Sequence, residues 1–207
     1  MREKSPKSTA VPPGSVLKCS GSRHTIGAKN HFSWSKLLAN ANNWTDIEAQ
    51  VDRAIERAGW FATGVFPEVV SGTPAFTYSA GFGETLGIPD VVIVGFDPQL
   101  AHGLLSAIYE QVKAGHVAIP EAGGKIHEII QDYPVRFDPV PDDLLKGFAT
   151  VTLLRDGAMG RQTRFMHMLL PDRNGKFAGE PGADDDYAAR QALYGILTGP
   201  DETPRLH

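Results

Sequence analysis

The stretch 73–96, TPAFTYSAGFGETLGIPDVVIVGF, constrains the possible fold more than any other part of the chain. It contains two short apolar runs, residues 75–80 and 91–94, separated by a segment rich in glycine. The Val, Ile, Phe, Tyr and Thr residues of these runs favour the pleated, half-buried surface of a sheet, and clustered glycines allow tight turns and close approaches. The stretch therefore predicts two core strands whose connecting loop carries Glu84 and Asp90 to one edge of a sheet, where a rigid scaffold often presents a site.

Length and composition fit one globular domain with tails. The chain has 207 residues, of which 42% are apolar and 21% charged, and a body of this size can bury a core without metal or disulfide help. Cys19 is the one cysteine, which excludes an intrachain disulfide and fits a reducing compartment. No apolar run is long enough to cross a membrane, and none follows the N-terminal basic residues as a secretory signal requires. We therefore expect a cytoplasmic protein without membrane contact.

Charge is distributed unevenly along the chain. Residues 1–31 contain six basic residues and one acidic residue, a net charge of +5, so the remainder carries −9 of the total of −4. Such a basic arm is typical of a solvated leader, and the alternative is that it docks, with Phe32, Trp34 and Trp44, on a partner or on a second copy in a homo-oligomer. The acidic body has no basic patch interleaved with aromatic residues, so nothing favours nucleic acid.

Local patterns predict an α+β fold, with helices packed on a mixed, largely antiparallel sheet. Thr45 and Glu48 fit a capping box, and Gly59 fits the left-handed end of the same helix. Asp97 followed by Pro98 indicates the start of a second helix, which continues to a glycine at position 115. The predicted strands are 60–66, paired as a hairpin with 75–80, then 91–94, 116–119, 134–140 and 163–170.

Several segments carry more particular expectations. Residues 134–140 are expected at the edge of the sheet because prolines cannot donate to a ladder. Residues 148–154 alternate like a strand, with a helix running on to residue 159 as the alternative, and the type of 125–132 stays open. Short helices are expected at 142–145 and 187–197, and Asn174-Gly175 predicts a turn. The expected organisation is an arm at 1–43, one domain at 44–198 and a polar tail at 199–207.

Motifs in this order resemble an uncharacterised bacterial family, the domain of unknown function numbered 4262. Residues 76–82, FTYSAGF, are similar to its F-x-Y-T-x-G-L element, and residues 88–95, IPDVVIVG, to its H-P-E-L-I-V-x-G element. Residues 171–177, PDRNGKF, match its P-D-x-x-G-x-F turn. A Gly-Trp pair at 59–60 and the run GEPG at 179–182 complete the likeness, which covers about residues 45–195. The resemblance implies a compact α+β domain and brings no established activity.

The chain departs from the family pattern at three places. It has Ile88 where the family usually has histidine and Asp90 where it has glutamate. Ala178-Gly179 stands where a Pro-Trp pair is common. If that histidine or tryptophan serves chemistry in the relatives, this chain has lost or altered it.

Metal and nucleotide signatures are absent from the sequence. The glycines at 81, 83 and 87 lack the spacing of a phosphate-binding loop, although backbone N–H groups there can cradle an anion. His102, His116, His127 and His167 are not paired at ligand spacing, and there is no C-x-x-C motif, so no metal site is expected. No cofactor is identified, and neither a nucleophile elbow nor a cysteine within the domain indicates covalent catalysis.

Two hypotheses concern a site in the domain, beside the interaction role of the arm. The first is a module that binds a small anionic or polar metabolite. The second is a small acid–base enzyme of hydrolase or lyase type, with Glu84, Asp90 and His127 as catalytic candidates. Two residues also have structural alternatives, since Arg136 can pair with Asp138 and Asp172 can cap its own turn. The candidate ligand-binding residues are Tyr78, Gly81, Gly83, Glu84, Asp90, Arg136 and Asp172.

Overall fold

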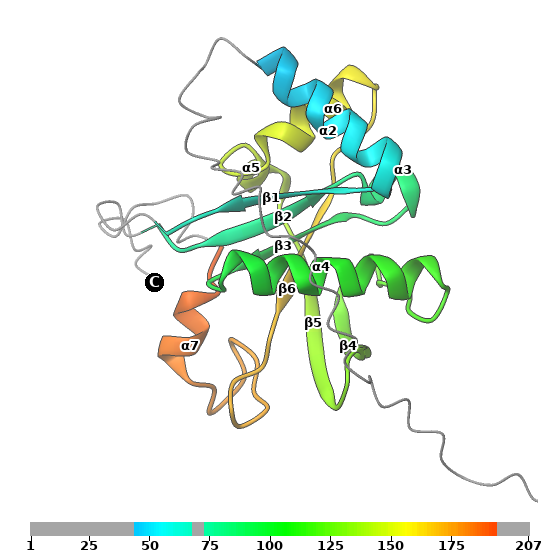
Figure 1. Ribbon diagram of the computed structural model, residues 1–207. Helices are drawn as coiled ribbons and strands as arrows, with labels where there is room; N and C mark the ends of the chain where they lie inside the picture. Colours follow the sequence, from blue (N-terminus) through cyan, green and yellow to red (C-terminus); the bar gives the residue numbers. More distant parts are fainter. Residues whose placement is uncertain (1–43, 68–72, 194–207) are drawn as a thin grey trace, which may run out of the picture. The chain divides into compact units, whose positions relative to one another are not determined.

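A computed structural model describes residues 44–67 and 73–193, and within them six strands form one sheet accompanied by six helices (Figure 1). The predicted arm at 1–43 and tail at 199–207 lie outside the described residues. None of the described helices has the length and apolar character that a membrane crossing requires. In chain order the elements are α2 (Trp44–Ala58), β1 (Phe61–Val65), β2 (Phe76–Ala80), α3 (Phe82–Thr85), β3 (Asp90–Val94), α4 (Pro98–Lys113), β4 (Gly124–Ile130), β5 (Tyr133–Pro139), α5 (Asp142–Leu145), α6 (Thr150–Ala158), β6 (Phe165–Leu169) and α7 (Asp185–Arg190).

The sheet is mixed and largely antiparallel, as predicted. Its strand order is β1-β2-β3-β6-β5-β4, and β3 and β6 are the one parallel pair. The expected β1–β2 hairpin is confirmed. Asp90 lies opposite Phe165 at the start of the parallel pair, and its backbone N–H donates to the carbonyl of Arg164 at 3.0 Å. Segments far apart in the sequence therefore begin side by side at the centre of the sheet.

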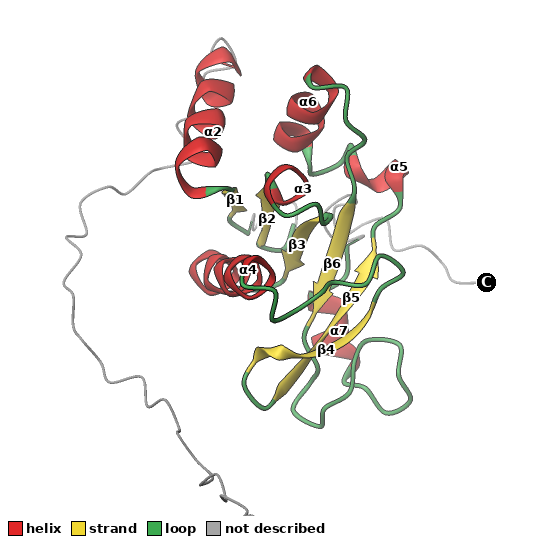
Figure 2. Ribbon diagram, turned by 90° about the vertical axis from the view of Figure 1, so that its right-hand side faces the viewer, coloured by secondary structure: helices red, strands yellow, loops and turns green. Residues whose placement is uncertain are grey.

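Both faces of the sheet are covered, which explains why β3 is buried at every position. Val91 and Ile93 pack in one cluster with α4 residues, whereas Val92 and Val94 join a second cluster with Leu145 of α5. Figure 2 shows α4 and α5 on opposite sides of the strands. An apolar run without polar alternation is what a strand covered on both faces requires.

The two clearest helix predictions are confirmed. Helix α2 ends at Ala58, and Gly59 follows it with a φ of 85°, the left-handed conformation expected there. The helix begins at Trp44, one residue before the predicted N-cap Thr45, whose side chain lies outside the described part of the structure. At the start of α4 the Asp97 side chain accepts from the backbone N–H of Gln99 at 2.9 Å, and Pro98 occupies the first turn. The predicted turn at residues 174–175 and the short helix α5 are also present.

The prediction of an edge strand at 134–140 is wrong, because β5 lies between β6 and β4. The prolines are accommodated in two different ways. The β4–β5 ladder is irregular between Ile126 and Ile130, which spares Pro134 a ladder bond, and Pro139 is the last residue of the strand. The segment 125–132, whose secondary structure the sequence did not decide, contains most of strand β4.

Three further expectations are corrected. Residues 116–119 form no strand, and the N–H groups of His116 and Val117 instead donate to the Gln111 carbonyl and close the C-terminal end of α4. Residues 148–154 follow the alternative, the helix α6. The helix expected at 187–197 begins earlier, at the Asp184 N-cap, and ends at Arg190, so α7 is short.

The close contact at Gly95 should make its replacement by alanine cost more unfolding free energy than the same replacement at Gly175. Both Gly95 and Gly175 have left-handed φ values, 82° and 74°. A Cβ at Gly95 would overlap the carbonyl oxygen of Arg190, whereas one at Gly175 would meet open space. We expect Gly175→Ala to lower the free energy of unfolding by about 1–2 kcal/mol, the cost of the left-handed backbone alone. Gly95→Ala should lower it by clearly more, because α7 must also move.

Urea denaturation followed by circular dichroism measures both losses. Equal losses in the two variants would show that the close approach between residue 95 and α7 contributes nothing to stability.

Candidate functional site

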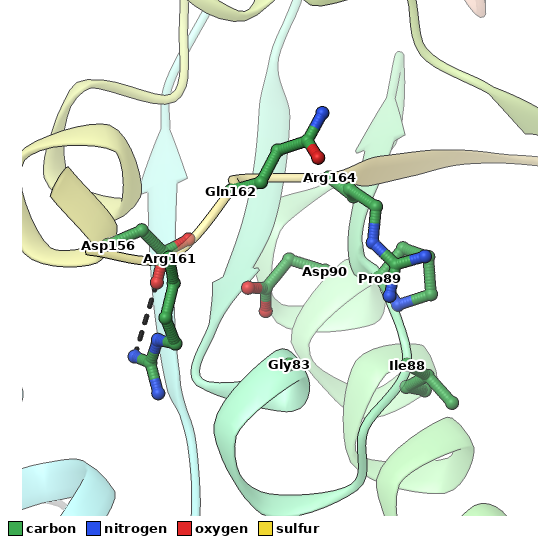
Figure 3. Close-up of a pocket in the computed structure, with 8 residues that line it drawn as sticks. All are labelled: Gly83, Ile88, Pro89, Asp90, Asp156, Arg161, Gln162 and Arg164. Carbon is green, nitrogen blue, oxygen red and sulfur yellow. Dashed lines mark hydrogen bonds and ion pairs between the residues drawn. The ribbon is translucent and has the colours of Figure 1, made fainter. Parts of the chain in front are cut away.

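A pocket of about 180 Å³ opens at the N-terminal ends of the central, parallel strands β3 and β6 (Figure 3). Helix α3 and the turn before β3 supply one side of this pocket, and the end of α6 with the loop into β6 supplies the other. Its lining residues are Gly83, Ile88, Pro89, Asp90, Asp156, Arg161, Gln162 and Arg164.

Asp90 is the most buried charged residue of the pocket wall, with 4% of its surface exposed. Its Oδ1 accepts a hydrogen bond from the Ser79 hydroxyl at 2.6 Å and another from the Phe82 backbone N–H at 3.1 Å. The Ser79 oxygen in turn accepts from the N–H of Val91 at 2.9 Å. Gly81 makes this arrangement possible, since its φ of 105° turns the chain from β2 into α3 and directs the Phe82 N–H towards the carboxyl group.

Burial decides the protonation of Asp90. Removal from water raises the pKa of this carboxyl group from its ordinary value of 3.8 to about 7, and the negative charge of Asp156 acts in the same direction. The hydrogen bonds from Ser79 and Phe82 favour the ionised form and offset part of this effect. Asp90 therefore exchanges its proton near neutral pH, where both forms are populated.

Two arginines flank Asp90 in the pocket, as Figure 3 shows. Arg161 donates from Nη2 to Glu84 Oε2 and to Asp156 Oδ1, both at 3.2 Å. Arg164 donates from Nη1 to Glu121 at 2.7 Å. The two side chains are 33% and 46% exposed, so their guanidinium groups are within reach of a solute.

Glu84, on α3, does not line the pocket but pairs with the lining residue Arg161. Hydrogen bonds from Arg155, and secondarily from Arg161, hold the pKa of its carboxyl group below the ordinary value. Glu84 is therefore ionised at neutral pH and serves as an acceptor for arginines. That makes it a weaker candidate for proton transfer than Asp90.

Four of the predicted site residues come together here. Gly83 and Asp90 line the pocket, Gly81 forms the turn that supports Asp90, and Glu84 pairs with the lining residue Arg161. The predicted loop also contains the short helix α3, which the glycines had not indicated.

The other candidates do not line this pocket. Tyr78 lies in an aromatic cluster, with ring centroids 6.0 Å from those of Phe148 and Phe165, and burial raises its pKa. His127 is an exposed residue of β4. Arg136 donates to Asp138 at 2.9 Å, the structural alternative considered for it.

Asp172 caps its own turn, which was the structural role considered for it from the sequence. Its Oδ1 accepts from the N–H groups of Asn174 and Lys176, and its Oδ2 accepts from that of Asp184, at 2.8 to 2.9 Å. These three bonds fix the turn and the segment leading into α7. In the described part of the chain, no three or more His, Cys, Asp or Glu side chains gather as a metal site would require.

Sequence reasoning missed Ser79 and the half of the pocket that comes from the second half of the chain. Asp156, Arg161, Gln162 and Arg164 follow one another closely between α6 and β6. The one available signal was the cluster RQTR at 161–164, a polar segment that overlaps the start of the strand predicted at 163–170.

The described residues thus define an α+β protein with a small polar pocket at the start of its parallel strand pair. A model of the family described as Domain of unknown function (DUF4262) matches residues 54–184, and the chain belongs to this family. The matched range contains all six strands and every residue that lines the pocket. Comparisons with curated proteins and with solved structures gave no match.

The raised pKa of Asp90 predicts how stability changes with pH. Between about pH 4 and pH 7 the folded protein keeps a proton that the unfolded chain has lost, so this residue makes the fold less stable as the pH rises. Asp90→Asn keeps an acceptor for Ser79 and Phe82 but does not ionise. Relative to wild type, the variant should gain stability across this range, by at most on the order of 4 kcal/mol.

Asp172→Asn is the contrasting variant, because Asp172 and Asp90 affect the pH dependence of stability in opposite directions. The N–H of Lys176 is the first of several backbone donors that lower the pKa of Asp172, so its stabilising effect is present above about pH 4 and is lost as the pH falls. Urea denaturation of both variants from pH 2 to pH 8 measures the differences, since the effect of Asp172 changes below about pH 4 and that of Asp90 above it. A constant difference between wild type and Asp90→Asn would contradict the burial argument.

Proposed function

We propose that the pocket around Asp90 binds a small metabolite that carries a carboxylate. One observation carries this proposal: a buried carboxyl group shares the pocket with two accessible guanidinium groups, those of Arg161 and Arg164. A planar guanidinium matches the geometry of a carboxylate and binds it through charge-assisted hydrogen bonds.

The size of the pocket limits the ligand. A volume of about 180 Å³ slightly exceeds the roughly 150 Å³ of a protein cavity that holds benzene, and it is below the roughly 300 Å³ at which sites for drug-sized ligands begin. The ligand therefore has about ten non-hydrogen atoms or fewer. Ile88 and Pro89 supply an apolar wall for its uncharged part.

Both arginines already have acidic partners, but these pairs are weak competitors. Arg161 pairs with Glu84, and Arg164 with Glu121, near the surface, where ion pairs contribute about 0–1 kcal/mol. A ligand carboxylate that enters the less exposed pocket can replace them. Asp90 in its protonated form then donates a hydrogen bond to the ligand, whereas ionised Asp90 repels it.

A second candidate function is acid–base catalysis, the other hypothesis for this site. The observation that favours it is the titration of Asp90 near neutral pH inside a pocket that a solute can enter. His127 does not line this pocket, and Glu84 is held by arginines, so Asp90 is the residue to which this candidate assigns the proton transfer. Binding and catalysis differ in outcome: a bound ligand is recovered unchanged, whereas a substrate is converted by wild type and not by Asp90→Asn.

Benzoate and benzamide form a matched pair of probes, because they share size and ring but differ in charge. In a ¹H–¹⁵N NMR titration at constant ionic strength, benzoate should shift the amide signals of Gly83, Asp90 and Gln162, and benzamide should not. Arg164→Gln should weaken benzoate binding about tenfold, the effect of losing one charge-assisted interaction of about 1.4 kcal/mol.

Arg173→Gln is the control, because it removes an exposed arginine that does not line the pocket. It should leave the benzoate affinity unchanged. Equal shifts with benzamide, or equal effects of the two arginine variants, would argue against a carboxylate site.

The affinity for benzoate should also depend on pH. Because protonated Asp90 donates to the carboxylate and ionised Asp90 repels it, binding should weaken as the pH rises through about 7. Asp90→Asn donates from its amide at every pH and should flatten this dependence. Isothermal titration calorimetry from pH 5.5 to pH 8.5 measures both profiles, and a wild-type affinity that does not change over this range would exclude Asp90 as the donor.

A further inference from the structure

We propose that Glu84 acts as a latch on the pocket. Without ligand it holds Arg155 and Arg161, and on binding Arg161 leaves Glu84 for the ligand carboxylate, which releases the segment 156–164 from α3. This inference concerns the regulation of the same pocket, and its second half rests on the proposed function.

The latch joins three elements through one carboxylate. Oε2 of Glu84, on α3, accepts from Arg155 Nη1 at 2.5 Å and from Arg161 Nη2 at 3.2 Å. Arg155 lies on α6 and also donates from Nε to Asp52 on α2 at 2.8 Å. The end of α6 and the loop that follows it are therefore tied to α2 and α3 by ion pairs.

Besides the latch, the hydrogen bonds of this end of α6 lie mostly within the segment itself, where Asp156 accepts from the Arg161 N–H at 2.8 Å and from the Thr163 hydroxyl at 2.9 Å. Gly157 lies inside the helix near this end, where glycine is about 1 kcal/mol less favourable than alanine. Leu154 and Met159 are 46% and 45% exposed, so they contribute little apolar packing. Thr152, by contrast, is buried at the other end of the helix.

The same segment supplies half of the pocket wall. Asp156 belongs to α6, and Arg161 and Gln162 belong to the loop that leads to β6. Movement of residues 156–164 therefore changes access to Asp90. Because Arg161 bonds to Glu84 and is also a lining residue of the pocket, its guanidinium group can leave Glu84 for a ligand carboxylate. Figure 3 shows Arg161 next to Asp156, with which it also pairs.

Hydrogen–deuterium exchange of the ligand-free protein tests the latch without any ligand. In Glu84→Gln the amides of residues 156–164 should exchange faster than in wild type, because a neutral amide holds the two arginines less strongly. Asp138→Asn is the control: it breaks a comparable pair with Arg136 on β5, at 2.9 Å, and should leave the exchange of 156–164 unchanged. Unchanged exchange in Glu84→Gln would overturn the latch.

Asp52→Asn distinguishes the hold on segment 156–164 from the transfer of Arg161 from Glu84 to the ligand. It removes one partner of Arg155 but leaves the pair between Glu84 and Arg161 intact. It should speed the hydrogen exchange of 156–164 without changing the affinity for benzoate. Glu84→Gln should both speed the hydrogen exchange of 156–164 and tighten benzoate binding about two- to fivefold, because Arg161 no longer has to leave a carboxylate.

The two proposals fail in different ways. If wild type does not bind benzoate at the pocket, the proposed function and the exchange of Arg161 are wrong, while the exchange rates of the ligand-free protein still decide whether Glu84 holds the segment. If benzoate binds wild type and Glu84→Gln equally, Arg161 does not change partner and the latch is not coupled to binding.

Discussion

The buried carboxyl group of Asp90 is the interaction on which the centre of this fold depends. It stands at the first position of β3, and its hydrogen bonds reach back to Ser79 on β2 and to the N–H that opens α3. A carboxyl group taken out of water is tolerated only when such partners are present. The positions of β2, α3 and the start of β3 are therefore fixed together, and so is the floor of the pocket.

This arrangement explains why a structural residue is also the centre of the candidate site. The hydrogen bonds that support Asp90 come from one side, from β2 and α3, while α6 and the loop into β6 border the pocket that it lines. The buried surroundings raise the pKa of the carboxyl group, and the pocket gives a solute access to it. The removal of Asp90 from water thus raises its proton affinity and, for the same reason, makes the stability of the fold depend on pH.

Much of the local structure could be predicted from the sequence, because its causes are local. Caps and glycines near the ends of α2 and α4 are encoded within a few residues, and the apolar runs indicated β2 and β3. The family motifs likewise identified the domain that the chain belongs to. The prediction of β5 as an edge strand failed because proline forbids a ladder bond only where the ladder is regular, and the irregular pairing with β4 removes that requirement.

The candidate site shows the same division between local and distant causes. The sequence alone identified the half that comes from one stretch, Gly81 to Asp90, and placed it at a sheet edge. Only the tertiary structure brought Arg161 to Glu84, 77 residues away, because the parallel pairing of β3 and β6 that joins the two halves is a long-range contact with no local signature. The same long-range folding left Arg136, His127 and Asp172 outside the pocket, since residue type alone does not say which polar side chains the sheet brings together.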